Sequence, residues 1–135
     1  SALKRAIDRG INVEIMLSAK SDIPLTPDAS FYVANNLAKR GAKVYVFNGG
    51  FHHTKAMWAD STFCTIGSSN MDSRSLRCDY EVNTVIFSKE TVSELNEMFE
   101  KDITQSVLLT REYWKNRTTW KKFVSWFGNL LTPFL

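Results

Sequence analysis

Residues 51–70 read FHHTKAMWADSTFCTIGSSN, and this stretch holds both histidines of the 135-residue chain. Residues 53–59 and 63–66 are predicted to form strands, joined by a short turn at Asp60–Thr62. Side chains two positions apart in a strand share a face. We therefore expect His53 and Lys55 to point to the same side of a hairpin, and His52 to point to the opposite side.

The same stretch carries residue types that bind and transform a phosphate. A neutral imidazole can attack phosphorus or accept a proton near neutral pH, and a lysine beside it supplies a fixed positive charge. After the second strand, Gly67 permits close approach of the backbone, while Ser68 and Asn70 offer a hydroxyl and an amide donor. Because these protein donors already meet the charge of a phosphate, we expect neither a metal nor a cofactor.

The flanking sequence predicts an α/β fold. The segments ALKRAIDRGINVEIML (2–17) and NLAKRGAKVYVF (36–47) are similar pieces, each made of a helix, a glycine and a strand. Such units pack as a sheet with helices on its faces. Further elements are expected as a helix over 29–40 with Asp28 as its N-cap, a strand over 80–87, and a helix from Lys89 to about Val107 capped by Ser88.

The C-terminal residues 101–135 differ from the rest in charge and composition. They carry six basic and two acidic residues, a local net charge of +4, whereas residues 1–100 carry 11 basic and 12 acidic residues. This excess is a weak indication of an anionic partner. A tail helix is expected to end at Pro133 and either to pack on the domain core or to lie in a membrane interface. Its apolar face would hold Trp120, Phe123, Val124, Phe127, Leu130 and Leu131, with Lys121, Lys122, Ser125 and Asn129 opposite.

Other features of the chain are less informative. The longest apolar runs are only a few residues, so we expect no segment that crosses a bilayer. Cys64 and Cys78 lack the spacing of a metal site and are expected as reduced thiols, with a disulfide left open as an alternative. The chain opens on a helix that would normally return from an earlier strand, so we expect a fragment of a longer protein.

The complete spacing from His53 to Asn70 resembles a known motif. It reads His-x-Lys, four residues, Asp, six residues and Gly-Ser-x-Asn, which matches the HKD motif of the phospholipase D superfamily position for position. A His-x-Lys tripeptide alone would favour a surface strand, whereas the full string favours a site. GGFHHTKAMWAD (49–60) followed by GSSNMDSRSLRCDYEVN (67–83) is similar to the second, C-terminal HKD domain of bacterial cardiolipin synthases. The resemblance implies a phospholipase D-like α/β fold, a mixed β-sheet flanked by α-helices with a C-terminal amphipathic helical tail.

The resemblance also implies a role for each motif residue. His53 would be the catalytic histidine, while the motif's aspartate, Asp60, looks structural in this superfamily and buttresses the turn. Glu81 matches the carboxylate that orients the histidine in relatives, although by itself it would be a strand-end surface charge. The catalytic set is thus His53, Lys55 and Asp60, and the set that holds the substrate phosphate is Lys55, Ser68 and Asn70.

The family's reaction needs two histidines on opposite sides of phosphorus. One forms a phosphohistidine, and the other protonates the leaving alcohol and then activates the incoming one. Because adjacent strand residues face opposite ways, His52 cannot be the partner of His53. The resemblance therefore implies a phosphatidyltransferase that converts two phosphatidylglycerols into cardiolipin and glycerol, with the other HKD motif outside this chain and the isolated fragment inactive.

The same resemblance sets the expected domains and partners. Residues 1–107 would form the HKD domain and residues 108–135 the tail. The expected partners are phosphatidylglycerol and other anionic phospholipids, the N-terminal HKD half of the parent or a dimer mate, and a membrane surface, but no nucleic acid. The parent would be associated with the bacterial cell membrane and the fragment would be soluble.

The alternative is a phospholipase D-type phosphodiesterase or nuclease that acts as a dimer and brings two copies of His53 together. A nuclease should carry its basic residues around the site. Because the basic excess lies in the Trp- and Phe-rich tail, a membrane surface is favoured over nucleic acid.

Overall fold

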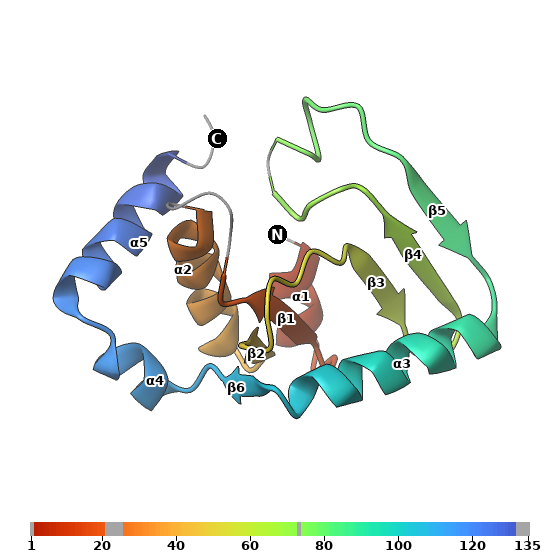
Figure 1. Ribbon diagram of the computed structural model, residues 1–135, viewed down its shortest axis with the longest axis horizontal. Coiled ribbons are helices and arrows are strands. Elements are labelled where there is room, and N and C mark those ends of the chain that lie inside the picture. Colours follow the sequence, from red (N-terminus) through yellow and green to blue (C-terminus); the bar gives the residue numbers. More distant parts are fainter. Residues whose placement is uncertain (1, 21–25, 73, 132–135) are drawn as a thin grey trace. The chain divides into compact units, whose positions relative to one another are not determined.

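The computed structural model describes residues 2–20, 26–72 and 74–131. Its elements (Figure 1) are α1 (Ala2–Asp8), β1 (Glu14–Ser18), α2 (Thr26–Ala38), β2 (Lys43–Phe47), β3 (Ala56–Ala59), β4 (Phe63–Gly67), β5 (Asn83–Ile86), α3 (Lys89–Ile103), β6 (Ser106–Leu108), α4 (Arg111–Asn116) and α5 (Thr119–Leu131). The predicted α/β fold with flanking helices and a C-terminal helix is confirmed. The strands form two three-stranded sheets, ordered β1-β2-β6 and β3-β4-β5.

The described chain divides into two compact units. The first unit combines the residues up to His52 with residues 105–131, and the second runs from His53 to Thr104. The expected division at residue 107, between an HKD domain and a tail, is a functional one and stays a prediction. Within the described helices, none is both long and apolar enough to cross a membrane.

The first unit is built from the repeated helix–glycine–strand piece. At the end of α1, Gly10 adopts φ +83°, its amide donates to the Ile7 carbonyl, and the Ile11 amide donates to the Ala6 carbonyl. This pair of bonds is the Schellman end of a helix, which favours glycine because other residues rarely adopt that φ. Gly41, with φ +113°, ends α2 in the same way.

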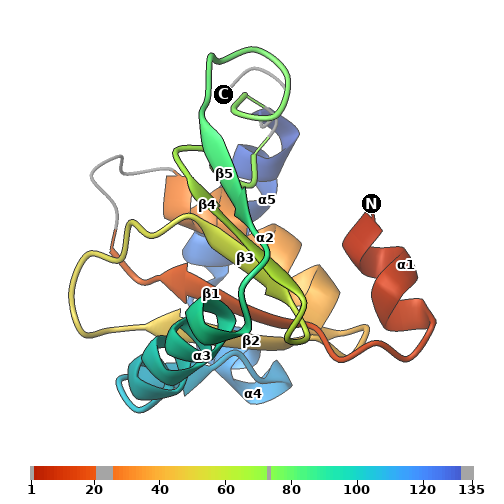
Figure 2. The same ribbon diagram turned by 90° about the vertical axis from the view of Figure 1, so that its right-hand side faces the viewer.

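Both helices are followed by strands that lie side by side. β1 and β2 are parallel (Figure 2), while β6 adds to β2 in the antiparallel direction. Helix α2 packs against β2, and the fully buried Val44 and Val46 of β2 form the centre of the core. A strand buried against a flanking helix is the packing expected for αβ units.

Helix α5 packs against α2, on a side that the sequence pattern did not predict. Its buried positions are Ser125 and Gly128, whereas the sequence pattern places Ser125 opposite the apolar face. The Ser125 hydroxyl donates to the Lys121 carbonyl within the helix at 2.8 Å, so it can be buried with a hydrogen-bond partner. Small residues allow two helices to approach closely, which the apolar period does not reveal. The expected stop at Pro133 and the side chains of residues 129–131 lie outside the described residues.

The second unit is an antiparallel sheet with α3 packed on one face (Figure 2). Cys64 of β4 and Val92 of α3 are fully buried, and Trp58 and Ile86 pack against them. Cys64 and Cys78 are both free thiols, the first buried and the second exposed. The Trp58 indole donates to Asn96 Oδ1 of α3 at 2.6 Å, which fixes the helix on the sheet.

Several predicted boundaries were wrong. The strand expected from residue 53 begins at Ala56, and the strand expected from residue 80 begins at Asn83. Helix α3 starts after its predicted cap, Ser88, which accepts from the Thr91 amide, but it ends at Ile103. The residues after it form β6, because β2 offers a free ladder edge there. Helix α2 starts at Thr26, so Asp28 lies inside it and is not its N-cap.

Candidate active site

The motif residues gather at the end of the β3–β4 hairpin that lies away from its turn. The ladder pairs Ala56 with Ile66, and the Gly67 amide donates to the Lys55 carbonyl at 3.1 Å. This bond continues the register by one pair, so Lys55 and Gly67 lie opposite each other. The hairpin therefore brings together two residues that are twelve positions apart in the sequence.

Lys55 and His53 are connected through the backbone that leads into β3. The ammonium group of Lys55 donates to the His53 carbonyl oxygen at 3.0 Å. Lys55 is half-buried and His53 is exposed. Residues 51–55 are outside any strand, so the expected strand alternation does not describe them. The ammonium group of Lys55 therefore lies at the backbone of His53, and the joint action of the two side chains on a phosphate stays a prediction.

Ser68 is the centre of a hydrogen-bond cluster between β4 and the segment before β5. Its hydroxyl donates to Glu81 Oε2 in a short hydrogen bond and accepts from the Val82 amide at 3.0 Å. The Ser68 amide in turn donates to the Val82 carbonyl at 3.0 Å. Glu81 is half-buried and Ser68 is exposed. The cluster brings a carboxylate to the predicted phosphate-binding hydroxyl.

Gly67 makes this close approach possible. A Cβ atom at this position would collide with the Val82 carbonyl oxygen and Asn83 Oδ1, and would lie 2.6 Å from Asn83 Cα. The glycine was expected to let the backbone approach closely, and the group that approaches is the backbone entering β5. Asn83 also donates to the Ser69 hydroxyl at 2.8 Å, which ties the two strands together beside the cluster.

Asp60 lies at the opposite end of the hairpin. It occupies the turn with φ +51°, next to the Thr62 amide that donates to the Ala59 carbonyl at 3.1 Å. Five residue steps along a strand separate it from Lys55, roughly 15 Å. Asp60 thus lies in the turn of the hairpin, and the structural role implied for the motif's aspartate stays a prediction.

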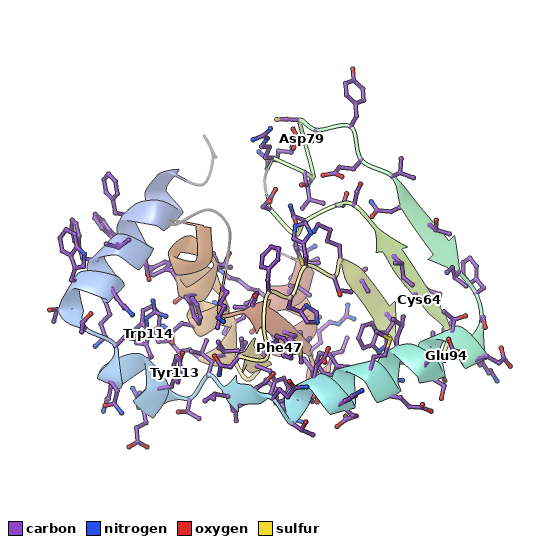
Figure 3. All side chains as sticks on the ribbon, in the orientation of Figure 1. Phe47, Cys64, Asp79, Glu94, Tyr113 and Trp114 are labelled. Atoms are coloured by element: carbon purple, nitrogen blue, oxygen red, sulfur yellow. The ribbon has the colours of Figure 1, made fainter. Side chains whose placement is uncertain are left out.

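The loop between β4 and β5 is ordered by its own polar groups. Asn70 is exposed in this loop. Arg74 donates from Nε to Asp79 at 3.1 Å, and this hydrogen bond, with the charge of Asp79, raises the pKa of the Arg74 guanidinium above its ordinary value. Figure 3 shows Asp79 at the far end of the loop. The Asp72 carboxylate accepts from the amide of the buried Ser75 at 2.7 Å. Arg74 therefore anchors the loop.

His52 has different surroundings from His53. Its amide donates to the Ser18 hydroxyl at 3.1 Å, and its ring lies edge-to-face on Phe47 with the ring centres 5.1 Å apart. These contacts are with β1 and β2 of the first unit. The two adjacent histidines thus belong to different units.

The sequence reasoning missed the contact between Ser68 and Glu81. The two residues are 13 positions apart, on either side of an irregular loop. The register of β4 and β5, which pairs Gly67 with Asn83, is the signal that would have predicted it. No group of three or more His, Cys, Asp or Glu side chains in the described residues is arranged to hold a metal ion. The arrangement offers a histidine, an ammonium group, a hydroxyl and a carboxylate for chemistry on a phosphate.

Two solved structures have a fold similar to that of this chain. Nuc, a phospholipase D family member from Salmonella typhimurium, superimposes with a TM-score of 0.71 at 22% identity, over 79% of this chain and 70% of that one. The phosphatidylserine synthase of Haemophilus influenzae superimposes with a TM-score of 0.74 at 13% identity, over 97% of this chain and 37% of that one. At these identities the likeness concerns the fold.

Sequence relatives are closer. Cardiolipin synthase 1 of Staphylococcus epidermidis is 38% identical over all 135 residues, and the cardiolipin synthase of Listeria monocytogenes is 36% identical over 134 residues. The chain spans 28% of the length of each of these relatives. The family model described as "Cardiolipin synthase, PLD-like domain" matches residues 1–103. The chain therefore belongs to the phospholipase D-like domain family of cardiolipin synthases.

Proposed function

We propose that this chain supplies the second half of the active site of a cardiolipin synthase. The observation that carries the proposal is the meeting of Lys55, Gly67 and Ser68 at one end of the β3–β4 hairpin, directly after His53. The substrates are two phosphatidylglycerol molecules, and the products are cardiolipin and glycerol. Membership of the cardiolipin synthase family supports this choice of substrate.

The reaction is a double displacement at phosphorus. The imidazole of one HKD half attacks phosphorus, and the bond from phosphorus to the glycerol oxygen breaks. The histidine of the other half gives that oxygen its proton, so glycerol leaves. The same histidine then takes the proton from a glycerol hydroxyl of the second phosphatidylglycerol, whose oxygen displaces the phosphohistidine nitrogen. His53 takes one of these roles, and a histidine outside this chain takes the other.

The remaining motif residues act on the phosphate and on the histidine. Lys55, Ser68 and Asn70 hold the non-bridging oxygens, whose charge grows in the transition state. Glu81 orients His53 and stabilises its cation. Asp60 acts through the turn of the hairpin. In the parent protein this site works at a bacterial membrane, where its lipid substrates are found.

The experiment uses a cardiolipin-deficient bacterium that expresses the parent protein carrying this chain. His53→Ala is expected to lower cardiolipin by at least about 100-fold, because loss of an acid–base or nucleophilic histidine removes that much rate or more. His52→Ala is the matched control and should keep cardiolipin near the wild-type level. Equal amounts of cardiolipin in the His53→Ala strain and the wild-type strain would refute the role of His53.

A second candidate function follows from the number of histidines. The chain contains only two, and they are adjacent, so a symmetric pair of chains would provide two copies of His53. The purified chain should then hydrolyse a chromogenic phosphodiester with a rate that rises as the square of chain concentration. Under the cardiolipin synthase proposal, the purified chain is inactive or very weak at every concentration.

A further inference from the structure

Asn83 is the first residue of β5, and it lies opposite Gly67 in the ladder between β4 and β5, two strands that run side by side (Figure 1). Its side chain contacts the end of β4 through both of its polar atoms. Asn83 Oδ1 lies where a Cβ atom on Gly67 would collide with it, and Asn83 Nδ2 donates to the Ser69 hydroxyl at 2.8 Å. None of the roles assigned so far to the HKD residues involves Asn83.

Ser69 is the residue between Ser68 and Asn70, the two small polar residues proposed to hold the phosphate. β4 ends at Gly67, so Ser69 and Asn70 follow outside the regular ladder. In the described part of the chain, the hydrogen bond from Asn83 is the one that holds residues 69–71. Ser69 is half-buried, whereas Ser68 and Asn70 are exposed. The Asn83 amide therefore holds the chain midway between two exposed side chains of the site.

Two consecutive residues at the start of β5 hold two consecutive residues after β4. The Val82 amide donates to the Ser68 hydroxyl at 3.0 Å, and the Val82 carbonyl accepts from the Ser68 amide at 3.0 Å. The Asn83 side chain then holds Ser69. One anchor would fix where the chain leaves β4, and the second also fixes the direction in which it leaves. Because Asn70 is the next residue, its placement depends on the anchor at Ser69.

The amide group of Asn83 suits a position beside a phosphate site. It donates a hydrogen bond to the Ser69 hydroxyl oxygen and carries no charge. A carboxylate at position 83 would place a negative charge near the phosphate and repel it. An apolar side chain would leave the Ser69 hydroxyl without this donor. The residue type is therefore matched to holding the chain without disturbing an anion.

We propose that Asn83 is a positioning residue of the phosphate site, which acts through Ser69 to place Ser68 and Asn70 against the phosphate oxygens. Asn83 itself does not touch the substrate. The charge on the non-bridging oxygens grows in the transition state, and donors stabilise that charge best when they are already held in place. The inference rests on the proposed function, which puts the phosphate at Ser68 and Asn70.

The test measures initial rates of cardiolipin formation by the purified parent protein over a range of phosphatidylglycerol contents in vesicles. Asn83→Ala should lower kcat at least about tenfold and change KM by less than about threefold, because misplaced donors act on the transition state. Ser69→Ala removes the same hydrogen bond from its other side and should have the same effect. Ser69→Thr keeps the accepting hydroxyl and should keep kcat near the wild-type value. The double variant Asn83→Ala, Ser69→Ala should be no slower than the slower single variant.

Asn96→Ala is the matched control in the same unit. Asn96 also makes a side-chain hydrogen bond, which it accepts from the Trp58 indole at 2.6 Å, but it lies on α3. This control should lower the thermal unfolding midpoint and leave kcat near the wild-type value. The proposal is overturned if Asn83→Ala keeps the wild-type kcat or if Ser69→Thr loses as much kcat as Ser69→Ala. It is also overturned if Asn96→Ala lowers kcat as much as Asn83→Ala, because the loss would then follow stability alone.

A second measurement separates this inference from the proposed function. Amide hydrogen exchange of the parent needs no turnover, and Asn83→Ala should speed exchange roughly fivefold in peptides that contain the Ser69 and Asn70 amides. Unchanged exchange would refute the anchor whatever the activity. If His53→Ala abolishes cardiolipin formation while Asn83→Ala keeps the wild-type kcat, the function stands and the positioning role is refuted. If His53→Ala leaves cardiolipin formation unchanged, the proposed function fails and the positioning role in that reaction fails with it.

Discussion

Replacement of Gly67 by alanine tests how the candidate site is assembled. The added methyl group would collide with the Val82 carbonyl oxygen and Asn83 Oδ1, and would lie 2.6 Å from Asn83 Cα. The Asn83 side chain can turn away, but it then loses its 2.8 Å bond to Ser69. The other two atoms belong to the backbone of Val82 and Asn83, where β5 begins. This backbone must move by more than about 0.8 Å, because Asn83 Cα lies 2.6 Å away, the Val82 oxygen is closer still, and ordinary contact begins at 3.4 Å.

The cost follows from these contacts. Overpacking of this kind costs about 1–3 kcal/mol, and each hydrogen bond lost between β4 and β5 costs about 1 kcal/mol. We expect Gly67→Ala to destabilise the β4–β5 pair by about 3 kcal/mol. Amide hydrogen exchange followed by mass spectrometry measures this in peptides that contain the Ser68 and Val82 amides. Their exchange should become faster by roughly 100-fold.

Gly10→Ala is the matched control for this experiment. A Cβ at Gly10 meets no atom within 4 Å, so the substitution costs only the backbone strain of φ +83°, about 1–2 kcal/mol. It lies in the first unit and should leave exchange in the β4–β5 peptides unchanged. If Gly67→Ala exchanges at the wild-type rate in those peptides, the close approach of β5 to Gly67 is refuted.

Three further substitutions test the packing of the two units. Trp58→Phe removes the indole donor to Asn96 and should lower the free energy of unfolding by about 1 kcal/mol in urea denaturation; an unchanged midpoint would contradict the role of that bond. Lys43→Ala should raise the pKa of Glu14 in an NMR titration, because the hydrogen bond from Lys43 is the main cause that lowers it. The stability that this pair contributes should be present above the ordinary pKa of a glutamate and disappear as the pH falls through the lowered pKa of Glu14. Gly41→Ala should cost about 1–2 kcal/mol in thermal unfolding, since its φ is +113°; a wild-type melting temperature would exclude the strained helix end.

Local patterns predicted the parts of the fold that depend on neighbours in sequence. The glycine that ends α1, the strand over 43–47 and the Ser88 cap of α3 were all predicted correctly from short segments. Each is stabilised by atoms within a few residues, so the sequence around it carries the information. The two strand-like runs on either side of the turn at Asp60–Thr62 predicted the hairpin for the same reason.

Features that depend on distant partners were not predicted. The three-residue strand β6 exists because β2 provides a ladder edge, and its own residues continue the pattern of α3. Residues 53–55 and 80–82 were expected to be in strands, but the regular pairing of β3 and β5 with β4 does not include them. The burial of Ser125 depends on the close approach of α2. The hydrogen bond between the Ser68 hydroxyl and Glu81 depends on how β4 and β5 pair across the long loop.

The hydroxyl of Ser68 has a single hydrogen, and Glu81 receives it. A phosphate held by Ser68 needs that same hydrogen, so it must replace the carboxylate as acceptor. The Glu81 carboxylate and the substrate phosphate therefore compete for the same hydrogen of the Ser68 hydroxyl. In a site that works as proposed, arrival of the phosphate turns the Ser68 hydroxyl away from Glu81 Oε2, while Oε1 can accept from the histidine throughout. Binding of the lipid phosphate therefore changes the partner of one hydroxyl and leaves the carboxylate with an oxygen to spare.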